Sequence, residues 1–523
     1  MPKKHPVDKT VIDSVAVVHS LAKGEGKWVL LVTILGSGMA FIDSTAMNVV
    51  LPILQLELDA TIPQMQWIIE AYAIFMSSLM LLGGALGDKF GRRRMFAVGV
   101  VVFSLASIWC GVAPSTGHLI VARAFQGVGG ALLVPGSLAI VNVSFSEKER
   151  GRAIGTWSAF TAMTTALGPI LGGWLAENIS WRLVFFINIP LSIIVLAALF
   201  FKIPETKKDN GEGKLDLPGS LFATLSLGCI VYALIESGNS GFGHPKVIVP
   251  FVAGGLSLMA FLYHEYRTPS PMMPLSLFRS MTFSGANVVS ALFWAAWVGG
   301  IFFVPFNLIQ IQGYSAAGVG IAFIPLVLAL FLFSRWAGGL VGNYGARLPI
   351  IAGTFLAGIG CLLFTRPDIG GSYWTTFFPA IAVLGVGMAV AISPLTTAVM
   401  SSVRIEHSGI ASAINNTVGR IAGLLSIAIL GVFALSTFNN NLDRELSVMD
   451  LTPDTIQAID SQRIKLAAID VPEDLPADTR TELRRAISES FVGTFRTMME
   501  ISAALLFAGS IISWLTIGRL RPG

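Results

Sequence analysis

A succession of long apolar windows, separated by short polar turns, limits how this chain can fold. Most windows hold about 20 residues or more, the length that an α-helix needs to cross the hydrocarbon core of a bilayer. Their apolarity is continuous rather than alternating, which argues against strands. We therefore predict an all-α polytopic membrane protein with fourteen transmembrane helices. The windows are 28–51, 64–87, 95–113, 118–143, 152–176, 182–201, 216–236, 246–265, 281–310, 316–341, 348–365, 373–400, 408–435 and 496–518.

The composition supports this class. Of 523 residues, 54% are hydrophobic and 13% are charged, whereas soluble domains carry about 25% charge. An ordinary cytosolic enzyme, a nucleic-acid binder and a disordered scaffold are therefore excluded. Cys110, Cys229 and Cys361 lie far apart in apolar runs, so neither a disulfide framework nor a metal site is predicted. The first apolar window is too long for a signal peptide and is predicted to be the first transmembrane helix.

Lysine and arginine gather in alternate short loops, which predicts the orientation in the membrane. With the N-terminus inside, the inner loops contain Lys89, Arg92, Arg93, Arg94, Lys148, Arg150, Arg152, Lys202, Lys207, Lys208 and Lys214. Arg519 and Arg521 follow the last window. We predict a multi-pass protein of the cytoplasmic (inner) cell membrane with both termini in the cytoplasm.

Two sequence echoes indicate an internal repeat. The stretch GALGDKFGRR (84–93) aligns with GGLVGNYGAR (338–347) at an offset of 254, and Gly127-Val128-Gly129 aligns with 385–387 at an offset of 258. Parallel repeats with a site at their interface are a transporter design. The predicted order is a cytoplasmic tail (1–27), a six-helix half (28–201), linkers with two extra helices (202–280), a second six-helix half (281–518) and a cytoplasmic tail (519–523).

A long acidic stretch, residues 437–492, interrupts the second half and lies outside in this topology. It contains two proline-bearing segments, and residues 479–490 have the pattern of an amphipathic helix. We expect a solvated outer hairpin. A role as a lid or in stability is the alternative.

Several motifs occur in the order typical of one family. They are FIDSTAMNVVLP (41–52), WIIEAYAI (67–74), GALGDKFGRRR (84–94), RAFQGVGGA (123–131), GPILGG (168–173), SWRLVFFINIP (180–190) and DLPG (216–219). Together they resemble the major facilitator superfamily, and within it the fourteen-helix drug:proton antiporter family. The resemblance covers nearly the whole chain except the termini and the long outer loop.

The resemblance implies gating roles for the residues of three motifs. In the loop motif these are Gly84, Asp88, Gly91 and Arg92, in the fourth helix Gln126 and Gly127, and in the fifth Gly168, Pro169, Gly172 and Gly173. Asp88 is a candidate latch that pairs with Arg92 or a helix N-terminus, and Gly342 replaces it in the second copy. The alternatives are a positive-inside anchor for the loop motif and ordinary close packing for the fifth helix.

Buried charge gives the proton-coupling candidates, because ionisable groups inside a bilayer are costly. Asp43, Glu70 and Arg123 fall roughly 7 to 10 Å below the outer ends of their windows. Burial favours a protonated carboxyl, whereas a nearby arginine favours the charged form. We predict Asp43 as the leading site, Glu70 as the second and Arg123 as the tuning group. The alternatives are a structural acceptor for Asp43 and an interfacial position for Glu70.

The second half lacks an obvious deeply buried acid, but Arg420 lies near the middle of its helix, close to Asn415 and Asn416. Aromatic, methionine and amide side chains are candidates for a substrate cavity. They are Trp157, Phe160, Met163, Trp294, Trp297, Phe306, Asn307, Gln310, Asn415 and Asn416. Packed or lipid-facing aromatics are the alternative.

We predict a secondary active transporter, a proton-coupled antiporter that exports drugs or other amphipathic compounds by alternating access. No phosphate-binding loop or catalytic motif occurs, so no enzyme activity and no cofactor are expected, and the proton gradient supplies the energy. Expected partners are small amphipathic substrates and membrane lipids, but no nucleic acid. A monomer is expected, with a periplasmic adaptor left open. The alternative is a dedicated exporter of one lipid, peptide or metabolite.

Overall fold

The computed structural model describes residues 25–145, 147–205, 216–268, 271, 273–403 and 408–518, and its regular elements are helices. Most of the predicted N-terminal tail and the whole predicted C-terminal tail lie outside these residues. The helices are α1 (Glu25–Glu57), α2 (Ile62–Phe90), α3 (Arg92–Gly111), α4 (Thr116–Ser144), α5 (Glu147–Asn178), α6 (Leu183–Phe186), α7 (Asn188–Lys202), α8 (Leu217–Ser240), α9 (Pro245–Arg267), η2 (Leu275–Arg279), α10 (Met281–Phe306), η3 (Asn307–Ile311), α11 (Ala316–Ala322), α12 (Ile324–Tyr344), α13 (Arg347–Leu363), α14 (Phe377–Ser401), α15 (Ser408–Leu446), α16 (Pro453–Asp460), η5 (Arg463–Ala468) and α17 (Ala477–Thr516).

Each apolar window coincides with a helix or with two consecutive helices. The window 182–201 is divided into α6 and α7, and the window 316–341 is divided into α11 and α12. By length and composition, 11 helices of the described residues can cross a membrane. The all-helical membrane fold is therefore confirmed, whereas the count of fourteen spans stays a prediction.

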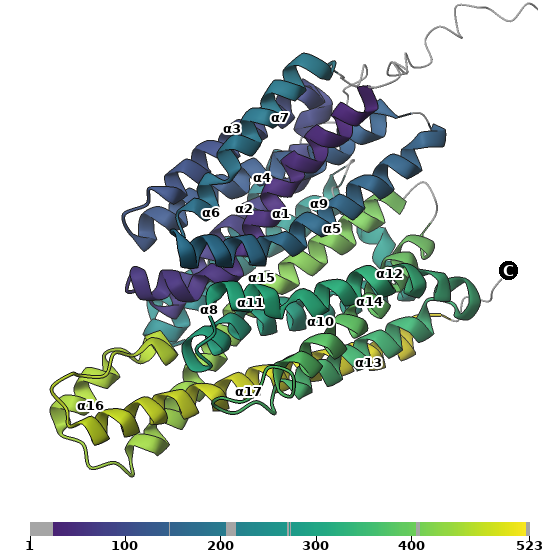
Figure 1. The fold of residues 1–523 in the computed structure, drawn as a ribbon. Coiled ribbons are helices and arrows are strands. Elements are labelled where there is room, and N and C mark those ends of the chain that lie inside the picture. Colours follow the sequence, from purple (N-terminus) through teal and green to yellow (C-terminus); the bar gives the residue numbers. More distant parts are fainter. Residues whose placement is uncertain are drawn as a thin grey trace, which may run out of the picture.

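The helices form two groups with an extra pair beside them. In Figure 1 the purple and blue helices α1 to α7 lie together, and the green and yellow helices α10 to α17 form the other group. Helices α8 and α9 pack against each other, and α8 also packs against α2 in the first half and α15 in the second. The extra pair thus contacts both halves.

The two copies of the loop motif end their helices in the same way. Gly91 follows α2 with φ of 103°, and Gly345 follows α12 with φ of 71°. Both conformations lie in the left-handed region that favours glycine. The positions differ by the same offset of 254 that relates the two motifs, so the repeat is visible in the helix ends.

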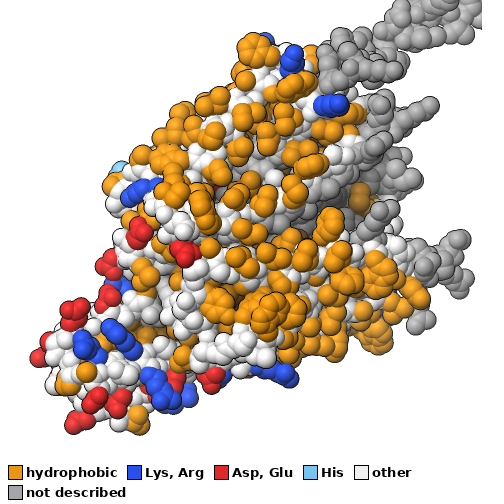
Figure 2. Space-filling model, viewed as in Figure 1, with side chains coloured by type: hydrophobic (Ala, Val, Ile, Leu, Met, Phe, Trp, Pro, Cys, Tyr) orange, Lys and Arg blue, Asp and Glu red, His pale blue; other side chains and the backbone are white. Residues whose placement is uncertain are grey.

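The long stretch 437–492 is more regular than its polarity predicts. Helix α15 continues to Leu446 and α17 begins at Ala477, which makes the predicted amphipathic helix the first part of α17. The end hairpin, residues 447–476, carries only α16 and η5. Figure 2 shows acidic and basic side chains gathered at this end of the molecule, beside a broad hydrophobic surface. We call this the hairpin end.

The end hairpin lies against the tips of α1 and α2. Lys465 Nζ is 2.5 Å from Asp59 Oδ1, in the turn between these helices, and the Lys465 carbonyl accepts a hydrogen bond of 2.9 Å from Gln55 Nε2. Gln55 in turn accepts a bond of 2.9 Å from Gln310 Nε2 of the second half. A hydrogen-bonded chain therefore links both halves to the hairpin.

Candidate functional site

The centre of the first half contains a buried ion pair. Asp43 lies on α1 and Arg123 on α4, with 1% and 0% of their surfaces exposed. The Arg123 guanidinium donates through Nη1 to Asp43 Oδ2. Its Nε donates to the Ile68 carbonyl of α2 at 3.1 Å. The arginine thus ties three helices together around one carboxylate.

Gln126, one turn along α4, extends the pair into a network. Its Oε1 accepts from Arg123 Nη1 at 2.7 Å, and its Nε2 donates to Asp43 Oδ1 at 2.8 Å. The same Nε2 lies 2.8 Å from Ser107 Oγ on α3, which also accepts from Asn188 Nδ2 on α7 at 3.0 Å. Both carboxylate oxygens of Asp43 therefore have side-chain donors.

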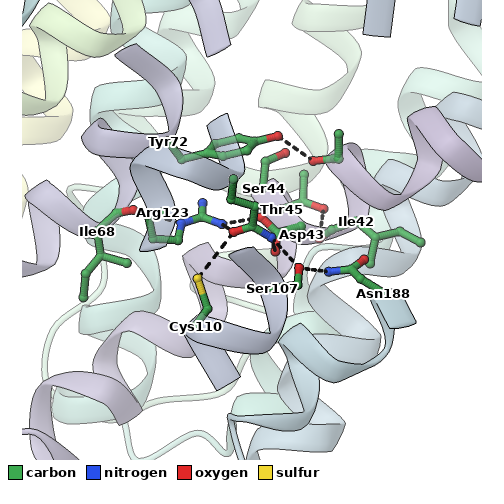
Figure 3. A network of polar contacts seen from close by, with 12 residues as sticks. Ile42, Asp43, Ser44, Thr45, Ile68, Tyr72, Ser107, Cys110, Arg123 and Asn188 are labelled. Atoms are coloured by element: carbon green, nitrogen blue, oxygen red, sulfur yellow. Dashed lines mark hydrogen bonds and ion pairs between the residues drawn. The ribbon is translucent and has the colours of Figure 1, made fainter. Parts of the chain in front are cut away.

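Tyr72 covers the other face of the arginine. The guanidinium carbon lies 4.3 Å from the ring centroid, a cation–π contact, and the tyrosine hydroxyl donates to the Ala40 carbonyl at 3.3 Å. Figure 3 shows the ring beside the guanidinium, between the helices that carry Arg123 and Asp43. The charge of Arg123 is thereby supported by groups other than Asp43.

This arrangement suits reversible protonation. A proton on Asp43 removes the negative charge of the pair, and Gln126, the Ile68 carbonyl and Tyr72 still contact Arg123. An isolated buried charge costs several kcal/mol or more. The Ile68 carbonyl, the Gln126 amide and the Tyr72 ring each lower this cost for Arg123.

Of the predicted coupling residues, the structure brings Asp43 and Arg123 together, with Gln126 between them, but not Glu70. Glu70 has no exposed surface. It lies on the face of α2 that carries Gln66 and Ile74, next to α8 and α15, and its carboxylate oxygens have no hydrogen-bond partner among the described residues. It is a separate buried acid at the junction of the halves.

Four contributors to the network were missed or undervalued by sequence reasoning. Three of them are polar side chains inside apolar windows, namely Ser107, Asn188 and Tyr72. Their polarity in an apolar window was the only sequence feature that could have identified them. Cys110, expected only as a small filler, has its Sγ 3.7 Å from Gln126 Oε1. Short polar side chains are common in membrane helices, so the signal does not select these residues.

The glycines of the fifth-helix motif mark close helix contacts. A Cβ atom on Gly168 would lie 1.9 Å from Thr45 Oγ1, and one on Gly172 would lie 2.6 Å from the Ala46 Cβ, both on α1. A Cβ on Gly173 would lie 2.2 Å from the Ala316 carbonyl oxygen of α11. Pro169 also belongs to this seam, because its carbonyl faces Gly320 of α11. The motif joins α5 to its own half and to the other half.

Two further hydrogen bonds between the halves lie toward the same end. Gln66 Nε2 of α2 donates to the Ile427 carbonyl of α15 at 2.8 Å, and the Gln310–Gln55 bond joins η3 to α1. In the fourth helix, Gly127 allows α4 to approach the Tyr72 carbonyl of α2 within the first half. The halves are therefore closed against each other at the hairpin end.

The loop motif has an ion-pair partner outside the motif that the sequence analysis did not identify, because Glu205 Oε2 lies 3.6 Å from Arg94 Nε. Glu205, after α7, accepts from the backbone nitrogens of Arg93 and Arg94 at 3.0 and 3.1 Å and caps α3. A Cβ on Gly91 would lie 2.6 Å from Glu205 Oε1, whereas Gly84 faces Pro135 of α4. Arg92 begins α3. The side chain of Asp88 lies outside the described residues, so the predicted latch stays a prediction.

The predicted cavity residues of α5 do not lie together. Trp157 is buried in the core of the first half. Phe160 and Met163 are exposed in a stripe with Leu167 and Trp174, and Trp174 adjoins the glycine that meets α11. The stripe is thus separate from Trp157, and the cavity role of Phe160 and Met163 stays a prediction.

The predicted cavity residues of the second half are divided between packing and polar contacts. Trp294 and Trp297 pack on the main apolar core, in which Phe306 is fully buried. Asn307 is buried at the end of α10, and Gln310 bonds to Gln55. Asn415 donates to Ser290 Oγ at 2.6 Å and to Asn287 Oδ1 at 3.2 Å, whereas Asn416 is exposed.

Comparison with known proteins agrees with this architecture. The model of the Major Facilitator Superfamily matches residues 33–427. The multidrug resistance protein Stp of Mycobacterium tuberculosis is 32% identical over 429 residues, which cover 82% of this chain and 79% of that protein. The tetracenomycin C resistance and export protein of Streptomyces glaucescens is 28% identical over 508 residues, covering 96% and 94%. The puromycin resistance protein of Streptomyces alboniger is 35% identical over 407 residues, covering 77% and 80%.

The fold agrees as well. A bacterial homologue of the human lysosomal transporter Spinster, in an inward-facing and unoccupied conformation, superimposes with a TM-score of 0.66 at 17% identity. The match covers 96% of this chain and 100% of that one. The chain is thus an integral membrane transporter rather than an enzyme, and it belongs to the Major Facilitator Superfamily.

Proposed function

We propose that this transporter is a proton-coupled antiporter that exports amphipathic compounds from the cytoplasm by alternating access, with Asp43 as the proton carrier. The observation that carries the proposal is the buried Asp43–Arg123 pair with its Gln126 bridge. The names of relatives that confer resistance to several drugs or antibiotics favour export over uptake. The proton gradient across the cytoplasmic membrane is the proposed energy source.

The proposed cycle uses the seam between the halves. In this structure the halves meet at the hairpin end, through Gly173 with Ala316 and Gln66 with Ile427. In the proposed topology that end is external, both termini are cytoplasmic, and this state receives substrate from inside. Opening the seam would hydrate Asp43, let it take a proton from outside, and release the substrate there. Closing it again would restore the Arg123 contact and discharge the proton inward.

The decisive experiment measures proton release from purified protein in liposomes, with a pH-sensitive dye, when ethidium is added. Asp43→Asn keeps the shape of the side chain but cannot ionise, so the ethidium-induced proton signal should disappear. Asp450→Asn, which changes an exposed acid of the end hairpin, is the matched control and should behave like the wild type. A wild-type signal that persists in Asp43→Asn would refute Asp43 as the carrier and direct attention to Glu70.

The same assay separates a broad exporter from a dedicated one. Fold alone does not determine substrate, so the alternative is a transporter of one lipid, peptide or metabolite. Proton signals with several unrelated cationic, neutral and anionic compounds support the broad exporter. A signal with a single compound would support the dedicated one.

A further inference from the structure

A second arginine within an apolar window, Arg420, lies at the seam between the halves. Arg420 is on α15, 12 residues after Ser408, and so about 18 Å along the helix. This is close to the middle of a hydrocarbon core about 30 Å thick. A charge at that depth is expensive and marks a ligand or ion path.

The arginine faces the first half. Its Nη1 is 4.0 Å from Met76 Sδ on α2. Ile427 and Gly431 continue the same stripe of α15, and both meet Gln66 of α2. Arg420 therefore lies on the seam one to two turns from the hydrogen bond that closes it at the hairpin end.

Arg420 has no acidic partner within the described part of the chain. The other deeply placed arginine, Arg123, is paired with Asp43, whereas the thioether of Met76 is only a weak acceptor. Glu70 lies on the same seam, but no ion pair joins it to Arg420 in this state. Arg420 is only partly buried, so several of its donors are available to another molecule.

The neighbouring side chains suit a flat compound. Gly419, the residue before Arg420, abuts the Trp294 indole, where a Cβ atom would lie 2.5 Å from the ring. Asn416, one turn before Arg420, is exposed and is a polar group beside it. A guanidinium with free donors pairs bidentately with a carboxylate, a geometry that an ammonium cannot reproduce.

We propose that Arg420 binds a carboxylate or similar anionic group on the exported amphipathic compound. This specifies the substrate class and rests on the proposed export function. An anionic group suits this site better than a cation does, because the acid of the first half is already paired with Arg123 and the free charge at the seam is positive.

The test compares two dyes that differ only in this group. Rhodamine 6G is an ethyl ester, and its hydrolysed free acid has the same ring system with a carboxylate. Fluorescence polarisation gives the Kd of each dye for purified protein in lipid nanodiscs, with empty nanodiscs as the blank. The wild type should bind the acid roughly tenfold to 100-fold more tightly, as expected for hydrogen bonds to charged groups.

Three variants identify the cause. Arg420→Gln should abolish the preference for the acid, and Arg420→Lys should keep part of it. Arg485→Gln, which neutralises an exposed arginine of α17, should bind both dyes as the wild type does. Equal Kd values in the wild type would overturn the proposal. So would an equal loss of both dyes in monodisperse Arg420→Gln, because that would indicate a structural role.

Ethidium-induced proton release in liposomes, measured on the same preparations, keeps the two proposals apart. If that signal depends on Asp43 but the preference for the acid is absent, only the Arg420 site fails. If the preference is present and the proton signal is absent, antiport fails and the binding site stands.

Discussion

Replacing Gly173 by alanine should open the seam at the hairpin end. The added Cβ atom would lie 2.2 Å from the carbonyl oxygen of Ala316 and 2.6 Å from its carbonyl carbon. These are backbone atoms of α11 and cannot rotate away, so α5 and α11 must separate by about 1 Å to restore van der Waals contact. Overpacking of this kind costs about 1–3 kcal/mol. The higher helix propensity of alanine stabilises α5 equally in the open and closed states, so it does not shift the equilibrium between them.

A cost of this size falls only on the closed state and shifts the equilibrium toward the open one by roughly 5-fold to 150-fold. Spin labels at Ile179→Cys and Ile369→Cys report the separation at the hairpin end, because both positions are exposed and lie in different halves. Cys229 is replaced by alanine, whereas Cys110 and Cys361 are buried. Double electron–electron resonance should show a longer distance in Gly173→Ala.

Gly255→Ala is the matched control, because nothing lies within 4 Å of the new Cβ atom on α9. It should leave the distance distribution unchanged. If Gly173→Ala gives the wild-type distribution as well, the contact does not hold the seam closed, and the argument from backbone approach is wrong.

Three further predictions concern separate contacts. Gly91→Ala should lower the unfolding free energy by more than about 1 kcal/mol, because φ is 103° and the Cβ would meet Glu205; a thermal melt no lower than that of Gly255→Ala would contradict this. Gln126→Leu should abolish ethidium-induced proton release but change the Kd of ethidium only a few-fold, since its amide holds Asp43 and Arg123; an unchanged proton signal would remove Gln126 from the site. Hydrogen bonding and charge from Asp59 raise the pKa of Lys465 in the folded protein. The stabilisation by this pair is therefore complete at pH values below the ordinary lysine pKa. It is lost as the pH rises through the higher pKa of the folded state, above about pH 10. A double-mutant cycle with Lys465→Gln and Asp59→Asn should therefore give a coupling of about 0.2–1 kcal/mol at neutral pH and none in strong alkali.

The helices were predictable because continuous apolar windows of this length have few other solutions. The contact of Asp43 with Arg123 was suggested by their similar depth, although α1 continues to Glu57 and Asp43 lies further from its end than its window implied. Depth is a one-dimensional property. It does not give the rotation of a helix about its axis, and for this reason the direction of Glu70, toward α8 and α15 instead of Arg123, was not predictable.

Because the sequence does not give the rotation of a helix about its axis, the positions of the aromatic residues of α5 were not predictable either. Helix α5 is apolar around most of its circumference in the window 152–176, so the pattern does not distinguish a lipid-facing stripe with Phe160 and Met163 from a cavity wall.

The helical content of the long polar stretch 437–492 was underestimated from its sequence. Its charged residues suit a solvated loop, but continuation of α15 and α17 satisfies their backbone groups before the end hairpin begins.

The position of α8 has a mechanical consequence for any movement of the halves. Ile74 of α2, Leu227 and Val231 of α8, and Leu424 and Ala428 of α15 form one small apolar cluster. Since α8 contacts a helix of each half, it cannot travel rigidly with both, and one of its two interfaces must slide during a rocking motion. Dispersion contacts have no preferred direction and re-form after a small displacement. The helices can therefore slide against each other at this cluster without losing specific contacts. Polar substitutions within it should slow the exchange between the open and closed states more than they shift the equilibrium between them.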